Sequence, residues 1–210
     1  MSLTASPDDV FINCPFDAEY DHVFRAIVFA TFACGFRPRS ARELDDSGFA
    51  RLDKILAIIE ECRYGIHDIS RTELDSASNL PRFNMPFELG LFIAAKRFGG
   101  GDHGKKRTLV MDIEAYRYQK FLSDLNGMDI ASHGGDPEIA VTKIRNWLAN
   151  VSRRQLASGN RVVTAYRNFT NDFPRICALQ DFDLGSVPYI DFERIVTDWL
   201  LTGSPELRTP

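Results

Sequence analysis

One acidic side chain stands out because it lies within an otherwise apolar stretch. Positions 84–95 read NMPFELGLFIAA, and Glu88 is the only charged residue among them. Pro86 suits the first turn of a helix, and the Asn84 side chain could cap that helix. An apolar helix is normally buried, and burial of a carboxylate is costly unless it is paired or neutralised. Glu88 is therefore a candidate for chemistry.

Two interpretations of Glu88 are open at this point. A glutamate in the first helical turn complements the helix macrodipole, which is worth about 0.3–1 kcal/mol. Alternatively, it is a catalytic carboxylate at the mouth of a cleft whose apolar walls set its pKa. Gly90, two residues on, indicates close approach of a strand or ligand, or tight helix packing.

A second group of polar residues ends the strand expected at 64–70, YGIHDIS. Asp68 could bind a ribose hydroxyl or orient a nucleophile, and Ser70 could bind phosphate or sugar. Both residue types also commonly satisfy loop amides, which is the alternative interpretation. His67 alternates with Asp68 and points to the opposite face, where a packed, hydrogen-bonded histidine is expected.

A third group ends the strand expected at 9–14, DVFINC. Asn13 could donate a hydrogen bond to a ligand there, and Pro15 stiffens the loop that follows. An ordinary strand-to-helix turn, capped by Asn or Asp, explains these residues equally well. No histidine partner is placed near Cys14, so we do not expect it to be a nucleophile.

Two further segments are charged or glycine-rich. One is a mixed-charge loop that contains Arg37, Arg39, Arg42, Glu43, Asp45 and Asp46. Its arginines could hold a phosphate or a carboxylate, or the loop could simply be solvated. The tract GGGDHGKKR at 99–107 lacks the P-loop pattern and leads into a strand, so it predicts a flexible loop.

Strand-like and helix-like segments alternate through the first 152 residues. The strands are expected at 9–14, 36–41, 64–70, 107–112 and 128–131, and the helices at 20–34, 49–62, 86–96, 119–125 and 137–151. This alternation predicts an α/β fold with a mostly parallel sheet, in a three-layer, doubly wound arrangement of flavodoxin-like or Rossmann-like type. The strand carboxyl ends then share one edge, where such folds bind ligands.

The pattern changes after residue 152. Helices are expected at 153–170 and 192–201, joined by a connector that contains aromatic residues, Pro and Gly. We therefore expect an α/β domain at 1–152 and a helical appendage at 153–210 that packs on it.

Composition limits the classes of partner. The chain has 210 residues, a formal net charge of −4 and a pI of about 5.6, so nucleic acid is not an expected partner. No apolar run reaches the roughly 18 residues of a membrane span, and the start MSLTASPDD lacks the features of a secretory signal. We expect a cytoplasmic protein.

Cysteine and histidine, the residue types that most often bind zinc or form disulfides, are dispersed along the chain. The four cysteines form no CxxC pair and suit buried apolar positions in a reducing compartment: Cys14, Cys34, Cys62 and Cys177. The histidines His22, His103 and His133 lack metal-ligand spacing. The sequence predicts no metal, zinc site or disulfide frame.

The order of DVFINCPFD, RLDKILAIIEECR, YGIHDIS and MPFELG resembles the Toll/interleukin-1 receptor (TIR) and nucleoside 2-deoxyribosyltransferase superfamily over residues 8–112. The matching positions are Asp68 and Ser70 at a strand end and Glu88 with Gly90 on a helix. The sequence departs from the family pattern at three places. Arg82 and Asn84 occupy the stretch where deoxyribosyltransferases carry an acidic residue before the glutamate, and Leu91 replaces the small residue that usually follows Glu-x-Gly. Met85 and Pro86 stand where TIR domains have a Trp-Cys pair.

The resemblance implies cleavage of an N-glycosidic bond in NAD or another nucleotide or nucleoside, with no cofactor required. Glu88 would stabilise or bond to the sugar C1′, and Asp68 would orient sugar hydroxyls or assist protonation. Asn13 and Phe16 would line the base or phosphate side. It also implies self-association and a role in bacterial defence or nucleotide signalling. The alternative is a non-catalytic TIR-like module that binds a nucleotide or assembles with itself.

Overall fold

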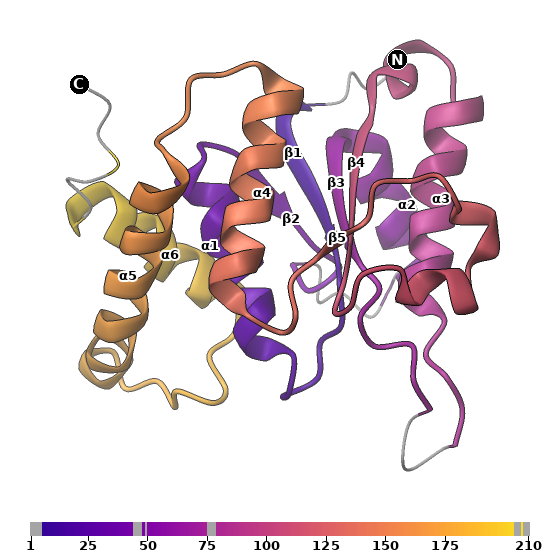
Figure 1. Ribbon diagram of the computed structural model, residues 1–210. Helices are drawn as coiled ribbons and strands as arrows, with labels where there is room; N and C mark the ends of the chain where they lie inside the picture. Colours follow the sequence, from indigo (N-terminus) through magenta and orange to yellow (C-terminus); the bar gives the residue numbers. More distant parts are fainter. Residues whose placement is uncertain (1–5, 44–47, 49, 75–78, 204–206, 208–210) are drawn as a thin grey trace.

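The computed structural model describes residues 6–43, 48, 50–74, 79–203 and 207, and its centre is a five-stranded sheet in the order β2-β1-β3-β4-β5 (Figure 1). All the strand pairings are parallel. The strands are β1 (Ser6–Asn13), β2 (Arg37–Arg39), β3 (Cys62–Asp68), β4 (Arg107–Asp112) and β5 (Ala131–Ser132). This is the flavodoxin-like strand order, so the predicted doubly wound α/β fold is confirmed.

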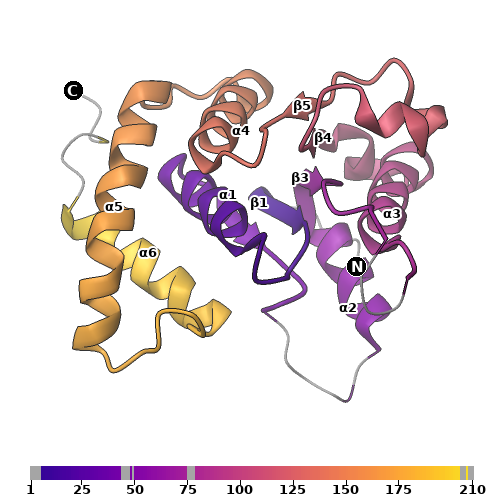
Figure 2. The same cartoon turned by 60° about the horizontal axis from the view of Figure 1, so that its bottom comes forward.

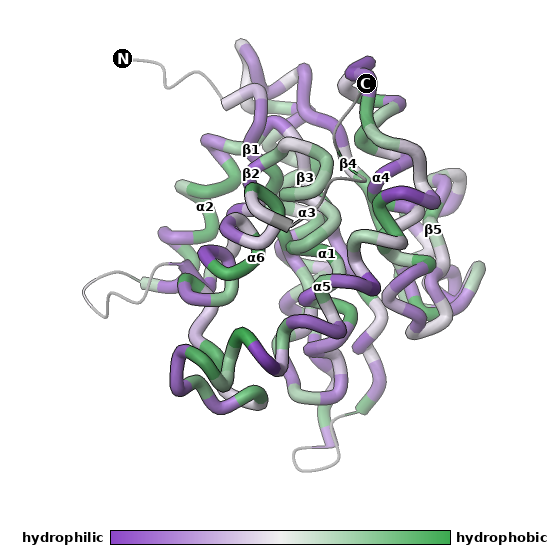
Figure 3. Tube along the Cα trace, turned by 90° about the vertical axis from the view of Figure 1, so that its left-hand side faces the viewer, coloured by the Kyte–Doolittle hydropathy of each residue, from purple (hydrophilic) through white to green (hydrophobic). Residues whose placement is uncertain are grey.

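Helices cover both faces of the sheet (Figure 2). One face carries α1 (Asp21–Ala33) and α4 (Pro137–Ser152), and the other carries α2 (Arg51–Glu61) and α3 (Asn84–Phe98). Helix α2 is amphipathic: hydrophilic and hydrophobic residues alternate along it (Figure 3), and Ile55, Ile58 and Ile59 are buried in a cluster with Phe11 of β1. This arrangement places α1 and α3 on opposite sides of the sheet.

Helices α5 (Gly159–Leu179) and α6 (Tyr189–Gly203) pack outside α1, on the side away from the sheet (Figure 1). Phe29 of α1 stacks on Phe169 with ring centroids 5.2 Å apart and also contacts Trp199 of α6. Helix α1 is therefore covered on both sides, which explains why it is apolar around most of its circumference. The C-terminal helices share one hydrophobic core with the sheet.

Several predicted elements differ in the structure. The helix expected from 153 begins at Gly159, after a Ser158 side chain that accepts a hydrogen bond from the Arg161 amide, and it continues through Pro174. The helix expected at 119–125 is two short 3-10 turns, and the last strand is Ala131–Ser132 instead of 128–131. The 99–107 tract, expected to be a flexible loop, holds the 3-10 turn Gly101–Lys105.

Helix α3 is only half buried, although its apolar sequence predicts full burial. Met85, Glu88, Leu89 and Phe92 face the sheet, while Phe83, just before the helix, and Phe87 are 64% and 54% exposed. The expectation of an all-round buried helix is therefore wrong. The buried face, and not the composition of the whole helix, determines the surroundings of Glu88.

Candidate functional site

A cavity of about 600 Å³ lies at the carboxyl ends of β1 and β3. The chain leaves β1 toward α1 on one face and leaves β3 toward α3 on the other, which opens a crevice between the two strands (Figure 2). Doubly wound folds bind their ligands at this topological switch point. The lining residues are Asn13, Cys14, Phe16, Asp17, Arg51, Arg82, Asn84, Met85 and Glu88.

Glu88 is 6% exposed and lines this cavity. Its carboxylate has no ion pair or hydrogen bond with any described residue. Burial raises the pKa of Glu88 to about 7, against the opposing influence of the Arg51 charge. Because α3 begins at Asn84 and has no acidic residue in its first turn, the macrodipole interpretation of Glu88 does not apply.

Asn13 joins the end of β1 to the first turn of α3. Its side-chain nitrogen donates to the Met85 carbonyl oxygen at 2.8 Å and lies 3.0 Å from Nδ1 of His67. Both of its N–H groups are therefore used within the protein. Asn13 lines the cavity, and its NH₂ group has no hydrogen left to donate to a ligand.

His67 is fully buried, with its ring 5.6 Å from that of Phe11 and 5.0 Å from that of Phe92. Burial lowers the pKa of His67 to about 3, so the ring is neutral. Gly65 makes room for it, because a Cβ at Gly65 would lie 2.6 Å from His67 Nε2. His67 is thus packed, as expected, and its Nδ1 supports Asn13, but its Nε2 has no hydrogen-bond partner among the described residues, so the ring is not fully satisfied.

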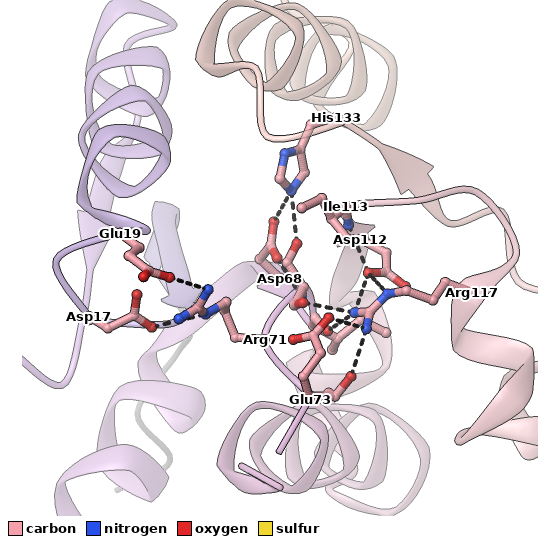
Figure 4. Close-up of polar contacts among 12 residues, drawn as sticks. Asp17, Glu19, Asp68, Arg71, Glu73, Asp112, Ile113, Arg117 and His133 are labelled. Carbon is pink, nitrogen blue, oxygen red and sulfur yellow. Dashed lines mark hydrogen bonds and ion pairs between the residues drawn. The ribbon is translucent and has the colours of Figure 1, made fainter. Parts of the chain in front are cut away.

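The rim of the cavity is built from charged side chains of two loops. Asp17, after β1, pairs with Arg71 at 3.4 Å and with Arg82 at 3.5 Å, both from the segment between β3 and α3 (Figure 4 shows Arg71). Phe16 lines the cavity and lies beneath the Arg42 guanidinium, 5.4 Å from its ring centroid. These contacts connect the two sides of the crevice.

Asp68 does not reach the cavity. It is fully buried, its Oδ2 lies 2.9 Å from Nε2 of His133, and its Oδ1 accepts from the Ser70 amide at 2.8 Å (Figure 4). Burial alone would raise the pKa of Asp68, but the hydrogen bonds from His133 and Ser70 outweigh it and the pKa is lowered. Asp68 and Ser70 organise the loop, so their predicted contact with a ligand is not supported by their positions.

Sequence reasoning missed the partners of this loop. Arg117 donates to Oδ1 of Asp112 at 2.6 and 2.9 Å and to the Ile69 and Ser70 carbonyls at 2.9 Å (Figure 4). Asp112 ends β4 as Asp68 ends β3, so the strand pattern could have identified it. Arg117 and His133 lie in irregular segments, and nothing in the sequence pairs them with these aspartates.

The other predicted binding residues have different positions. Asn84 lines the cavity but does not cap α3, whose N-cap is Phe83 without a side-chain hydrogen bond. Gly90 is exposed, and a Cβ there would meet nothing within 4 Å, so neither a strand nor a tightly packed side chain of the described residues approaches it. Pro15 is buried and is not part of the cavity wall.

Arg37 and Arg39 lie in strand β2 instead of the loop expected for them, and both are paired with carboxylates. Arg37 pairs with the buried Asp9, and Arg39 lies 2.6 Å from Glu43 and 2.8 Å from Glu61. These pairs leave the two arginines engaged with protein carboxylates. The predicted acidic positions 45 and 46 (Asp45 and Asp46) lie outside the described residues.

Comparison of the chain with models of known families, with curated proteins and with solved structures found no match. Within the described ranges, no three His, Cys, Asp or Glu side chains are grouped as metal ligands would be. In the same ranges, no helix combines the length and apolar character needed to cross a bilayer. What the chain does is therefore inferred from the chemistry of the cavity.

Proposed function

We propose that the cavity binds a nucleotide or nucleoside and cleaves its N-glycosidic bond, with Glu88 facing C1′ of the sugar. One observation carries this proposal: a nearly buried carboxylate, unpaired among the described residues, lines a ligand-sized cavity at the switch point of the sheet. Carboxylates that a fold keeps buried without a partner are concentrated at functional sites.

The chemistry follows from the charge that develops on the sugar. Departure of the base leaves an oxocarbenium-like centre at C1′, and the Glu88 carboxylate either stabilises that charge or bonds to the carbon. The nearby apolar walls, from Cys14, Phe16 and Met85, strengthen this interaction by excluding water. Water as acceptor completes a hydrolysis, and a second base completes a transfer.

Two arginines at the cavity suit an anionic substrate. Arg51 and Arg82 line the cavity together with Glu88, and guanidinium groups bind phosphate through charge-assisted hydrogen bonds. Asp68 has no direct part in this mechanism, since it is occupied by His133 and Ser70. We also propose a cytoplasmic location, which suits the four cysteines, all buried and free, and a reaction that needs no cofactor.

The test is release of free base from NAD and from a panel of nucleosides and nucleoside monophosphates, followed by chromatography. Glu88→Gln should reduce release at least 100-fold while the circular dichroism spectrum stays unchanged. The matched control is Glu60→Gln on the exposed side of α2, which should retain full activity. Turnover by Glu88→Gln at the wild-type rate would overturn the proposal.

The pH profile gives a second test of the same role. Because Glu88 must be ionised to stabilise positive charge and its pKa is raised to about 7, release should rise between pH 6 and pH 8. A rate that falls over this range would assign Glu88 to proton donation instead.

A non-catalytic assembly module is the second candidate, favoured by the exposed apolar side chains on α3 and in the segment just before it. Leu80, Phe83 and Phe87 are all more than half exposed. If the protein binds nucleotides without releasing base and Phe83→Ser with Phe87→Ser lowers its mass in light scattering, this function replaces the enzymatic one. A monomeric wild-type protein would exclude it.

A further inference from the structure

We infer that Asn13 is fixed as a hydrogen-bond acceptor, so that the cavity selects ligands that present an N–H or O–H donor beside Glu88, and that His67 is the positioning residue. This rests on the proposed function only in taking the cavity as the ligand site. It does not depend on whether a bond is cleaved there.

The chemistry of its neighbours determines which way the Asn13 amide faces. The Met85 carbonyl oxygen can only accept, so the group 2.8 Å from it must be the NH₂ of Asn13. The second hydrogen of that NH₂ is directed to Nδ1 of His67, at 3.0 Å. Oδ1 is the remaining polar atom of a side chain that lines the cavity, and it has no partner among the described residues.

His67 can support this orientation in only one protonation state. Its Nδ1 must carry a lone pair, so the neutral ring holds its proton on Nε2. The ring is fully buried between Phe11 and Phe92, and burial disfavours the charged form. A proton on Nδ1 would oppose the Asn13 N–H and force the amide away from Met85. The buried histidine therefore keeps Oδ1 turned to the cavity.

The acceptor oxygen lies close to the candidate catalytic group. Met85, which Asn13 contacts, precedes Glu88 by three residues on α3, and residues at this spacing are neighbours on one helix face. Both residues line the cavity. An ionised Glu88 and Oδ1 of Asn13 thus present two acceptors on the same wall. A ligand carbonyl placed there would leave a buried acceptor unsatisfied, whereas a donor would satisfy it.

A base amine and a sugar hydroxyl can both supply such a donor. Calorimetric binding to the wild-type protein distinguishes them with ligands that differ by one donor: adenosine against purine riboside, cytidine against pyrimidin-2-one riboside, and adenosine against its 2′-deoxy and 3′-deoxy forms. Loss of the donor that meets Asn13 should weaken binding about 10- to 100-fold, because it strands a buried acceptor. Loss of the others should change binding less than about 3-fold by the same reasoning.

Variants of Asn13 and His67 test the roles of these residues. The readout is the ratio of the affinities for the two ligands of the pair that the wild-type protein discriminates. Asn13→Leu should bring the ratio close to one. His67→Phe, which fills the space without an acceptor, should lower the ratio, and His67→Asn, whose Oδ1 can replace Nδ1, should retain it. A purely structural role would weaken both ligands equally and leave the ratio unchanged.

The outcomes separate this inference from the proposed function. Base release without any preference among the ligand pairs overturns the acceptor role and leaves the glycosidic chemistry standing. Donor preference without base release overturns the glycosidic chemistry and leaves the acceptor role standing. Failure of every ligand to bind overturns both. If the variants do not fold, the wild-type comparison decides alone, since equal affinity within every pair contradicts the inference.

Discussion

Two groups of charged residues lie at the same edge of the sheet, and they are built in opposite ways. The edge cluster consists of the buried residues Asp68, Ser70, Asp112 and His133 and the partly buried Arg117, and it is largely paired within the protein (Figure 4). The cavity between β1 and β3 contains Glu88, which is nearly as buried but has no partner in the part of the chain that the structure describes. Carboxylates at similar depth can therefore differ in whether the protein pairs them.

The difference lies in how each group meets the cost of leaving water. Hydrogen bonds from His133 and Ser70 outweigh the burial of Asp68 and lower its pKa, whereas the pair with Arg117 only partly offsets the burial of Asp112, whose pKa is raised. Both pairs hold the loops that follow β3 and β4 in place. Glu88 has no cationic or hydrogen-bond partner within residues 6–43, 50–74 and 79–203, and burial raises its pKa to about 7. A fold retains such a group at the expense of stability, which is expected where a ligand completes the site.

The largest expected effect concerns the edge cluster. Arg117→Met leaves the fully buried Asp112 without its cationic partner, so we expect the free energy of unfolding to fall by about 3–5 kcal/mol. Arg71→Met is the matched control, because Arg71 is 38% exposed and its ion pairs with Asp17 and Glu19 lie at the surface. It should cost less than about 1 kcal/mol. Urea unfolding measures both, and equal losses would contradict the distinction.

A smaller effect of opposite sign is expected in the cavity. The pKa of Glu88 is raised from 4.5 to about 7 in the folded protein, so the fold binds the proton more tightly than the unfolded chain does. The stabilisation from this protonated group is complete below pH 4.5 and is lost as the pH rises through 7. Ionised Glu88 then destabilises the fold, so Glu88→Gln should be more stable than wild type by about 1–3 kcal/mol at pH 8.

The control for this prediction is the same comparison at pH 4.5, where the carboxyl is protonated in the fold and the difference should largely disappear. Urea midpoints at the two pH values provide the measurement. If Glu88→Gln is less stable than wild type at pH 8, then Glu88 has a structural partner and belongs with the edge cluster.

The smallest effect defines where the cavity ends on α3. Gly90 lies on the exposed face with open space around it, so Gly90→Ala should stabilise the helix by about 0.5–1 kcal/mol and leave ligand binding unchanged. Gly65→Ala is the contrasting variant, since its Cβ would meet His67 and Phe92 within 3 Å. Gly65→Ala should lower the melting temperature. If Gly90→Ala instead weakens ligand binding, then the ligand site includes the exposed face of α3.

Much of the fold could be predicted from the sequence. Hydrophobic periodicity identified the strand Arg107–Asp112 at its exact bounds and placed α1, α2 and α4 within a few residues. It failed for the 119–125 segment, where two short 3-10 turns leave no helical pattern long enough to detect. It also started α5 early, because the turn before Ser158 has no periodicity of its own.

The candidate site was predictable in part. Glu88 was identified because a lone charge in an apolar helix requires an explanation, and Asn13 because polar residues at strand ends meet at one edge. Asp68 was selected by the same rule and did not reach the cavity, since His133, from a loop some 65 residues away, occupies it. A strand-end rule identifies the edge but not which residues face a ligand.

The sequence by itself determined the alternating elements, the parallel sheet and the residues that could act at its carboxyl edge, because periodicity and residue type are local properties. Only the tertiary structure decided that Asp68 and Asp112 are paired, that Glu88 is not paired with any residue the structure describes, and that the Asn13 amide presents its oxygen. The physical reason is that pairing and orientation depend on Met85, His67, Arg117 and His133, which are brought to these groups by packing across the sheet and not by proximity in the chain.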